Sequence, residues 1–187
     1  MIRAVLLACG FCLCVQPGQA QTSQFKGLAA VTHELSTRIA HRDAPLELHD
    51  FVPTYSLEEM LGAWGTFGSE HTFRNGAPNS LNVVIWRVTL SRFADAIGES
   101  CAAPRFVFNP RFLAVFRKLC AWPAAEAKSD AVLLDFWLGV MGYNAPEAEY
   151  VAWRDFFRGT YAQRSAAETV TAMTLAITMN PYFLLHK

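Results

Sequence analysis

The sequence of 187 residues predicts an all-α fold, a single-domain bundle of about six or seven helices with one disulfide. Three observations lead to this prediction. Apolar residues recur at spacings of three and four and not in the alternation typical of strands. Cap residues and prolines divide the chain into helix-sized pieces, with no linker long enough to separate two domains. Two cysteines remain once the first twenty residues are set aside.

Residues 1–20 have the pattern of a cleaved secretory signal peptide. Arg3 is followed by an uncharged run from Ala4 to Val15, and small residues then precede an expected cleavage point after Ala20. The apolar run is too short to span a membrane. We therefore expect a helical domain over residues 21–187, with no membrane span after signal cleavage and a periplasmic or extracellular location.

The composition limits the kinds of partner. Without Arg3, fifteen basic and sixteen acidic residues remain, a net charge of about −1, which predicts no nucleic-acid partner. Hydrophobic residues make up 52% of the chain and charged residues only 17%, against about 25% charged in average proteins. This surplus indicates either a thick core or an apolar surface that receives a partner.

Three helices are expected in the first half of the chain. Residues 25–40 carry apolar side chains three and four positions apart. A capping box from Ser56 to Glu59 opens a second helix that runs to Trp64. The longest helix covers residues 80–99 after the cap Asn79, and its two apolar stripes predict a central helix covered on two sides. The stripes are Leu81, Val84, Ile85 and Val88, and Trp86, Leu90, Phe93 and Ile97.

Three more helices follow, each with a local start signal. Asn109-Pro110 is a cap with a first-turn proline and starts a helix that ends near Cys120. Ser129 opens a helix that is apolar nearly all round and, being short, is expected in the core. Pro146 starts the next helix, for which Gly159 is the expected C-terminal stop.

A second capping box, from Ser165 to Glu168, opens the last expected helix, which runs to Asn180-Pro181. Its segment from Val170 to Met179 is rich in threonine and β-branched residues, so a strand is the alternative. The cap and the length of the segment favour a helix.

Cys101 and Cys120 are expected to form the disulfide. The cysteines at 9, 12 and 14 leave with the signal peptide, and an exported protein that keeps two cysteines is most simply disulfide-bonded. No Cys-x-x-Cys remains for a thioredoxin-type redox pair, and a zinc site would need two more ligands from distant histidines. No haem or nucleotide motif is present either, so no cofactor is expected.

A polar loop holds the candidate metal ligands. His41, Asp43, His49 and Asp50 lie within ten residues, and imidazole with carboxylate can hold a divalent metal or relay a proton. The spacing matches no familiar metal motif, and a solvated loop would have the same composition.

Asp135 is the candidate catalytic residue, since it is the sole charge between Ala131 and Tyr143. A carboxylate on an apolar helix must be paired, protonated or exposed at a gap. We expect a buried ion pair or hydrogen bond, and a proton donor in catalysis is the alternative. The arginines considered as partners are Arg87, Arg92 and Arg154.

Three aromatic residues are candidates for ligand binding. Trp64, Phe67 and Phe73 fall in a glycine-rich stretch, where they could form an exposed patch if they lie together. The alternative is that they close one end of the helical core.

The function expected from these features is that of an exported binding or assembly component of the cell envelope. Its partner would be another envelope protein or an apolar ligand. Hydrolase nucleophile motifs and phosphate-binding loops are absent, which makes an enzyme the second choice. That alternative is an envelope enzyme using Asp135 or the polar loop from His41 to Asp50.

The last third of the chain resembles a known group of domains. The stretch "VLLDFWLGVMGYNAPEAEYVAWRDFF", followed by "AMTLAITMNPYFLLHK", is similar to the closing helices of domains of unknown function in large secreted bacterial proteins that carry cytochrome c-like modules. The resemblance implies a helical envelope protein. This chain has no haem motif, so the resemblance implies neither a reaction nor a site.

Overall fold

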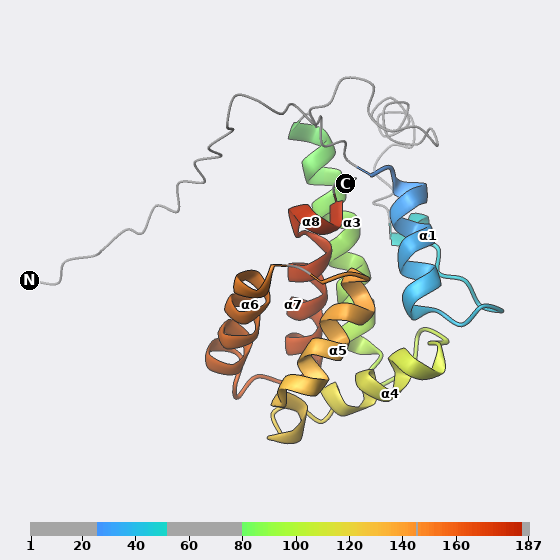
Figure 1. Ribbon diagram of the computed structural model, residues 1–187. Helices are drawn as coiled ribbons and strands as arrows, with labels where there is room; N and C mark the ends of the chain where they lie inside the picture. Colours follow the sequence, from blue (N-terminus) through green and yellow to red (C-terminus); the bar gives the residue numbers. More distant parts are fainter. Residues whose placement is uncertain (1–25, 52–79, 145, 185–187) are drawn as a thin grey trace, which may run out of the picture.

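The computed structural model describes residues 26–51, 80–144 and 146–184, and this part of the chain is all-α, as predicted (Figure 1). Its only strand-like pairings are isolated bridges, Ala40 with Phe108 and His41 with Ala44. The elements are α1 (Leu28–Ile39), the 3-10 turn η1 (Leu48–Phe51), α3 (Ser80–Glu99), α4 (Pro110–Leu119), the 3-10 turn η2 (Glu126–Lys128), α5 (Asp130–Met141), α6 (Glu147–Thr160), α7 (Ala166–Thr178) and α8 (Pro181–Leu184).

The long helix α3 packs along α7 and contacts η1, so the predicted central position belongs to α5 and not to α3. In Figure 1, α7 runs beside α3, α5 lies in front, α6 is on the left, α1 is on the right and α4 crosses the lower end. The most extensive helix contact is between α3 and α7, and α5 also packs against α1, α4 and α7. The position of α5 agrees with the prediction that it is a core helix.

The contact between α3 and α7 depends on a glycine. A Cβ atom at Gly98 would lie 2.5 Å from the carbonyl oxygen of Ala167 and would overlap the hydroxyl of Thr171. That hydroxyl donates to the carbonyl oxygen of Ala94 at 3.3 Å. Because real side-chain carbons never approach so closely, Gly98 permits this backbone-to-backbone contact.

One of the two stripes predicted on α3 is fully buried. Trp86, Leu90, Phe93 and Ile97 all belong to the hydrophobic core. In the other stripe, Val84 is 56% exposed, so the prediction of burial along both stripes is wrong there. The reason is positional, because the first turns of α3 extend past the other described helices (Figure 1).

Local start signals are confirmed where the structure describes them. Asn109 accepts a hydrogen bond from the amide of Phe112 at 2.8 Å, and Ser129 caps α5 in the same way. The capping box of Ser165 and Glu168 opens α7. The β-branched segment of α7 is therefore helical, and the strand alternative is wrong.

The predicted glycine stop is wrong. Gly159 lies inside the last turn of α6, whose C-cap is Tyr161. Among the described residues, the glycine with positive φ is Gly142, at 79°, and it ends α5. A Cβ atom there would overlap the guanidinium of Arg38, so a glycine is required by both the left-handed backbone and the close approach.

The disulfide between Cys101 and Cys120 is present, with Sγ atoms 2.03 Å apart and Cα atoms 5.2 Å apart. Cys120 is the C-cap of α4, and Cys101 lies two residues beyond the end of α3. The bond joins the ends of two consecutive helices, as predicted.

Several predictions fall outside the described residues. These are the signal peptide over 1–20, the helix from Ser56 to Trp64 and the aromatic candidates Trp64, Phe67 and Phe73. Within the described part, no helix combines the length and apolar character needed to cross a membrane.

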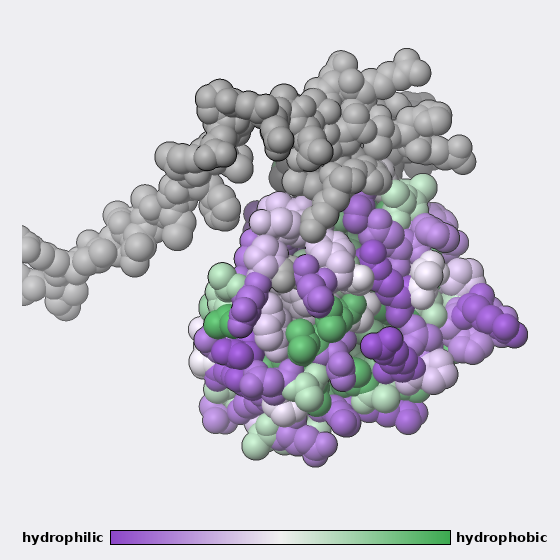
Figure 2. All heavy atoms as spheres, in the orientation of Figure 1, coloured by the Kyte–Doolittle hydropathy of each residue, from purple (hydrophilic) through white to green (hydrophobic). Residues whose placement is uncertain are grey.

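Most large apolar side chains of the described residues lie in the core. The face drawn in Figure 2 has small apolar groups over α5 and α6, and hydrophilic residues separate them. Large apolar side chains that remain exposed include Leu134 on α5, at 39%, and Phe156 on α6, at 51%.

Candidate functional site

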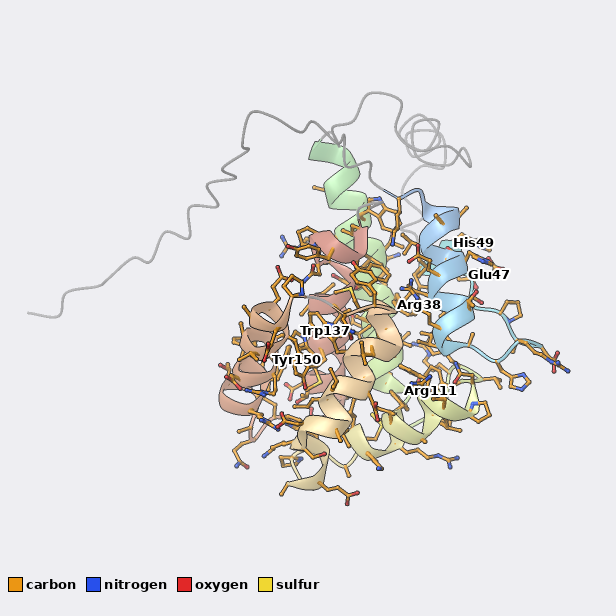
Figure 3. The ribbon with its side chains drawn as sticks, in the orientation of Figure 1. Arg38, Glu47, His49, Arg111, Trp137 and Tyr150 are labelled. Atoms are coloured by element: carbon orange, nitrogen blue, oxygen red, sulfur yellow. A yellow bond between two sulfur atoms is a disulfide. The ribbon has the colours of Figure 1, made fainter. Side chains whose placement is uncertain are left out.

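The two histidines of the polar loop contact different carboxylates and do not form one cluster. His41 Nδ1 lies 3.6 Å from Asp43 Oδ2, and His49 Nε2 lies 3.2 Å from Asp50 Oδ1. His49 also faces Glu47 at the edge of the molecule beside α1 (Figure 3). Across residues 26–51, 80–144 and 146–184, no three His, Cys, Asp or Glu side chains gather as metal ligands.

Asp135 is neither paired with a described residue nor buried and lies exposed at a gap between helices. Its side chain is exposed and lines a pocket of about 600 Å³ between α1, α4 and α5. It makes no ion pair with a described arginine, and Arg154 instead binds Asp130 and Asp155. The expected buried ion pair of Asp135 is therefore wrong, because its side of α5 faces out of the bundle.

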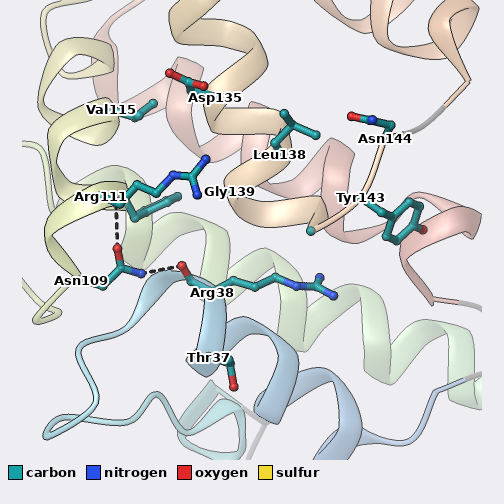
Figure 4. A pocket seen from close by; sticks show the side chains of 12 residues that line it. Thr37, Arg38, Asn109, Arg111, Val115, Asp135, Leu138, Gly139, Tyr143 and Asn144 are labelled. Carbon is teal, nitrogen blue, oxygen red and sulfur yellow. Dashed lines mark hydrogen bonds between the residues drawn. The ribbon is translucent and has the colours of Figure 1, made fainter.

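We call this cavity the polar pocket (Figure 4). The charged side chains on its walls are Arg38, Arg111 and Asp135, and its apolar surface comes from α4 and α5. No histidine from the described part of the chain lines it. The lining residues are Thr37, Arg38, Asn109, Arg111, Phe112, Val115, Asp135, Leu138, Gly139, Gly142, Tyr143 and Asn144.

One end of the polar pocket is held by Arg38. Its guanidinium donates to the carbonyl oxygens of Val140 and Met141, at 3.2 and 2.7 Å, and binds Glu34 at 2.9 Å. It thereby satisfies carbonyl groups that the end of α5 leaves without helical partners. Burial raises the pKa of Tyr143 to about 12, against the opposing effect of Arg38, so the phenol keeps its proton at neutral pH.

A second cavity, which we call the aromatic groove, lies between α3, α6 and α7. Its volume is about 660 Å³. Phe156 is its most prominent apolar side chain and is 51% exposed. The lining residues are Asp95, Glu99, Phe156, Thr160, Tyr161, Arg164, Ala167, Glu168, Thr171, Ala172 and Leu175.

Phe156 is held in place by neighbouring rings. Its centroid lies 5.2 Å from that of Phe157 in an edge arrangement and 5.6 Å from that of Tyr161. Phe157 is fully buried, and the carbonyl of Tyr161 accepts a hydrogen bond from the indole of Trp122 at 2.7 Å. The exposed ring of Phe156 is therefore held in one orientation by its contacts with Phe157 and Tyr161.

The rim of the aromatic groove carries more acidic than basic groups. Asp95, Glu99 and Glu168 line it together with a single arginine, Arg164. Burial, and secondly the charge of Glu99, raise the pKa of Asp95. Glu99 binds Arg105, whereas Asp95 makes no ion pair with a described residue.

Sequence reasoning did not identify Phe156 or Arg111. The pair Phe156-Phe157 offers one signal, since neighbouring helix positions point about 100° apart and both rings cannot face one core. Arg111 has no comparable signal, because an arginine in a first turn is typical of any exposed helix face.

Comparison of the chain with protein-family models, with curated proteins and with solved structures finds no match.

Proposed function

We propose that this protein is an exported binding or assembly component of the cell envelope and that the aromatic groove docks a helix of another protein. The observation that carries the proposal is the large, half-exposed ring of Phe156 over a groove of about 660 Å³. Aromatic rings held in place at the centre of a groove are typical anchors of protein interfaces.

The apolar surface of the groove suits the apolar face of an amphipathic helix. Phe156 on one wall faces a groove whose other wall includes Ala172 and Leu175 of α7. Small and aliphatic side chains opposite an aromatic ring leave space for inserted side chains, as in recognition of a helix by a groove.

The rim favours a partner with basic side chains. Asp95 has no described ion-pair partner and Glu168 adds negative charge, whereas Glu99 is paired with Arg105 and Arg164 is the one basic group of the lining. Charge complementarity of this kind selects partners and orients them more than it adds affinity. The occupant is therefore a basic, amphipathic helix.

Export is supported by the pattern of residues 1–20 and by the disulfide, which is typical of oxidising compartments. N-terminal sequencing of the native protein is expected to begin at Gln21. Intact mass is expected to show no free thiol before reduction and two afterwards. A native chain that still begins at Met1 and has two reactive thiols would contradict export.

Docking is tested by affinity purification of the tagged protein from the cells that make it. Mass spectrometry then quantifies the proteins that are purified with it. Phe156→Asp is expected to lower the amount of the partner by about 30-fold, the effect of losing an interface anchor worth about 2 kcal/mol. Leu134→Asp is the matched control, since it places the same charge at an exposed apolar residue on α5, outside the groove.

Asp95→Lys is a second variant that leaves the apolar contacts in place and reverses one charge of the rim. It is expected to weaken binding of the same partner and to reduce the salt dependence of binding. Unchanged recovery with Phe156→Asp, or an equal loss with Leu134→Asp, would contradict docking in the aromatic groove. Circular dichroism of each variant confirms that the fold is retained.

A further inference from the structure

The polar pocket is separate from the aromatic groove and shares none of its lining residues. Two oppositely charged side chains, those of Arg111 and Asp135, line it. Arg111 reaches from α4 toward α5, where Asp135 lies at the wall of the same cavity (Figure 4). Neither of them makes a hydrogen bond or ion pair with any residue that the structure describes.

Two other polar side chains of the pocket already have partners. Asn109 caps α4 and donates to the carbonyl of Arg38. Arg38 itself holds the end of α5 and Glu34. Arg111 and Asp135 are thus the charged groups of the pocket that remain available to a ligand.

The pocket also has an apolar lining. Phe112 and Val115 of α4 lie opposite Leu138 and Gly139 of α5. A Cβ atom at Gly139 would come within 3.1 Å of the Phe112 ring, so the two helices already touch beneath the pocket. The volume of about 600 Å³ lies within the range of small-molecule sites, about 300–1,000 Å³.

From this arrangement we infer that the polar pocket binds a small zwitterion with an apolar body, an amino acid or a short peptide. Its carboxylate pairs with the guanidinium of Arg111, which suits the planar geometry of that group. Its ammonium group pairs with Asp135. The apolar part covers Phe112 and Leu138.

Four probes separate these contacts by isothermal titration calorimetry of the purified protein. L-leucine carries both charges, leucinamide lacks the carboxylate and N-acetylleucine lacks the ammonium group. Leucyl-leucine carries both charges farther apart, so it distinguishes a peptide site from an amino-acid site. Saturable binding is expected for leucine or leucyl-leucine, and about tenfold weaker binding for each of the other two probes.

Three variants assign the contacts. Arg111→Gln is expected to bind the preferred probe about tenfold more weakly and to lose the discrimination against leucinamide. Asp135→Asn is expected to lose the discrimination against N-acetylleucine. Arg117→Gln is the matched control, an exposed arginine on the same helix outside the pocket, and is expected to bind as the wild type does.

Two results would overturn the assignment. One is the absence of saturable binding for all four probes up to about 10 mM, where affinity falls below the weakest specific complexes. The other is equal binding by the variants at 111 and 117. Thermal unfolding of all three variants verifies that they fold, and neither result bears on docking in the aromatic groove.

Discussion

The α3/α7 pair and α6 are held in the bundle by different kinds of contact. α3 and α7 approach backbone to backbone at Gly98, where no Cβ atom fits. α6 is held by rings, with Trp153 5.2 Å and Tyr150 5.9 Å from Trp137 of α5. Figure 3 shows Trp137 between α5 and α6, with Tyr150 beside it.

This difference explains where the aromatic groove forms. At Gly98 the backbones of α3 and α7 lie too close for a ligand to fit between them. Large rings on one face of α6 separate its backbone from the neighbouring helix. The ring of Phe156, on another face, is 51% exposed. The aromatic groove therefore has α6 as one wall and the closely packed pair α3 and α7 as the other.

The largest expected effect is the loss of the rings that hold α6. Trp153→Ala is expected to lower the free energy of unfolding by about 4 kcal/mol, because it removes a large buried side chain and leaves a cavity. Phe156→Ala on the same helix is expected to cost less than about 1 kcal/mol, since half of that ring is already exposed. Urea denaturation measures both, and equal costs would contradict the distinction between the two faces of α6.

The close contact of α3 with α7 is tested by Gly98→Ala. The added Cβ atom would clash with the Ala167 carbonyl oxygen and the Thr171 hydroxyl, and we expect a loss of about 3 kcal/mol. Gly159→Ala on α6 is the matched control, because a Cβ atom there meets nothing within 4 Å. It is expected to stabilise by about 0.5–1 kcal/mol through helix propensity.

Thermal denaturation of both glycine variants checks this prediction. If both variants lose stability, or if neither does, the close contact at Gly98 would not distinguish the attachment of α3 and α7 from that of α6.

The disulfide adds a third kind of attachment, just beyond Gly98. Replacing Cys101 and Cys120 by serine is expected to cost about 3 kcal/mol, according to the chain-entropy estimate for a loop of this length. The cysteines are 19 residues apart in sequence. Denaturation with and without reductant measures the effect in the wild type, and the serine variant is expected to be insensitive to reductant. A wild type that is equally stable in both conditions would contradict this role.

The smallest expected effect is the pH dependence contributed by Asp95. Burial and Glu99 raise its pKa from the ordinary value of 3.8, so the folded protein favours the protonated form more than the unfolded chain does. The unfavourable contribution is absent below pH 3.8, grows as the pH rises through the raised pKa and is complete above it.

Asp95→Asn removes this contribution. The variant is therefore expected to be slightly more stable than the wild type at pH 7 and equally stable at pH 3. Chemical denaturation at the two pH values tests the sign, and a variant that is less stable at pH 7 would contradict it.

Features set by neighbouring residues were predictable from the sequence. The caps Asn109, Ser129 and Ser165 bond to amides three residues on, so α4, α5 and α7 could be located correctly. The disulfide also followed, from the number of cysteines and the expected compartment.

Features set by distant residues were not predictable. Arg38, which is remote in sequence, lies against Gly142, where a Cβ atom would overlap its guanidinium. The exposure of Asp135 and Phe156 depends on the directions in which α5 and α6 pack, which apolar spacing alone does not define. For that reason the polar pocket and the aromatic groove can be recognised only in the folded structure.

The docking role of the aromatic groove is tested most directly by a photo-crosslinking residue at position 156 in the cells that make the protein. Position 134 is the matched control on α5. We expect a discrete covalent adduct from position 156 and none from position 134, with the attached peptide mapping to a basic amphipathic helix of one protein. No adduct at position 156, or the same adducts at both positions, would contradict the account.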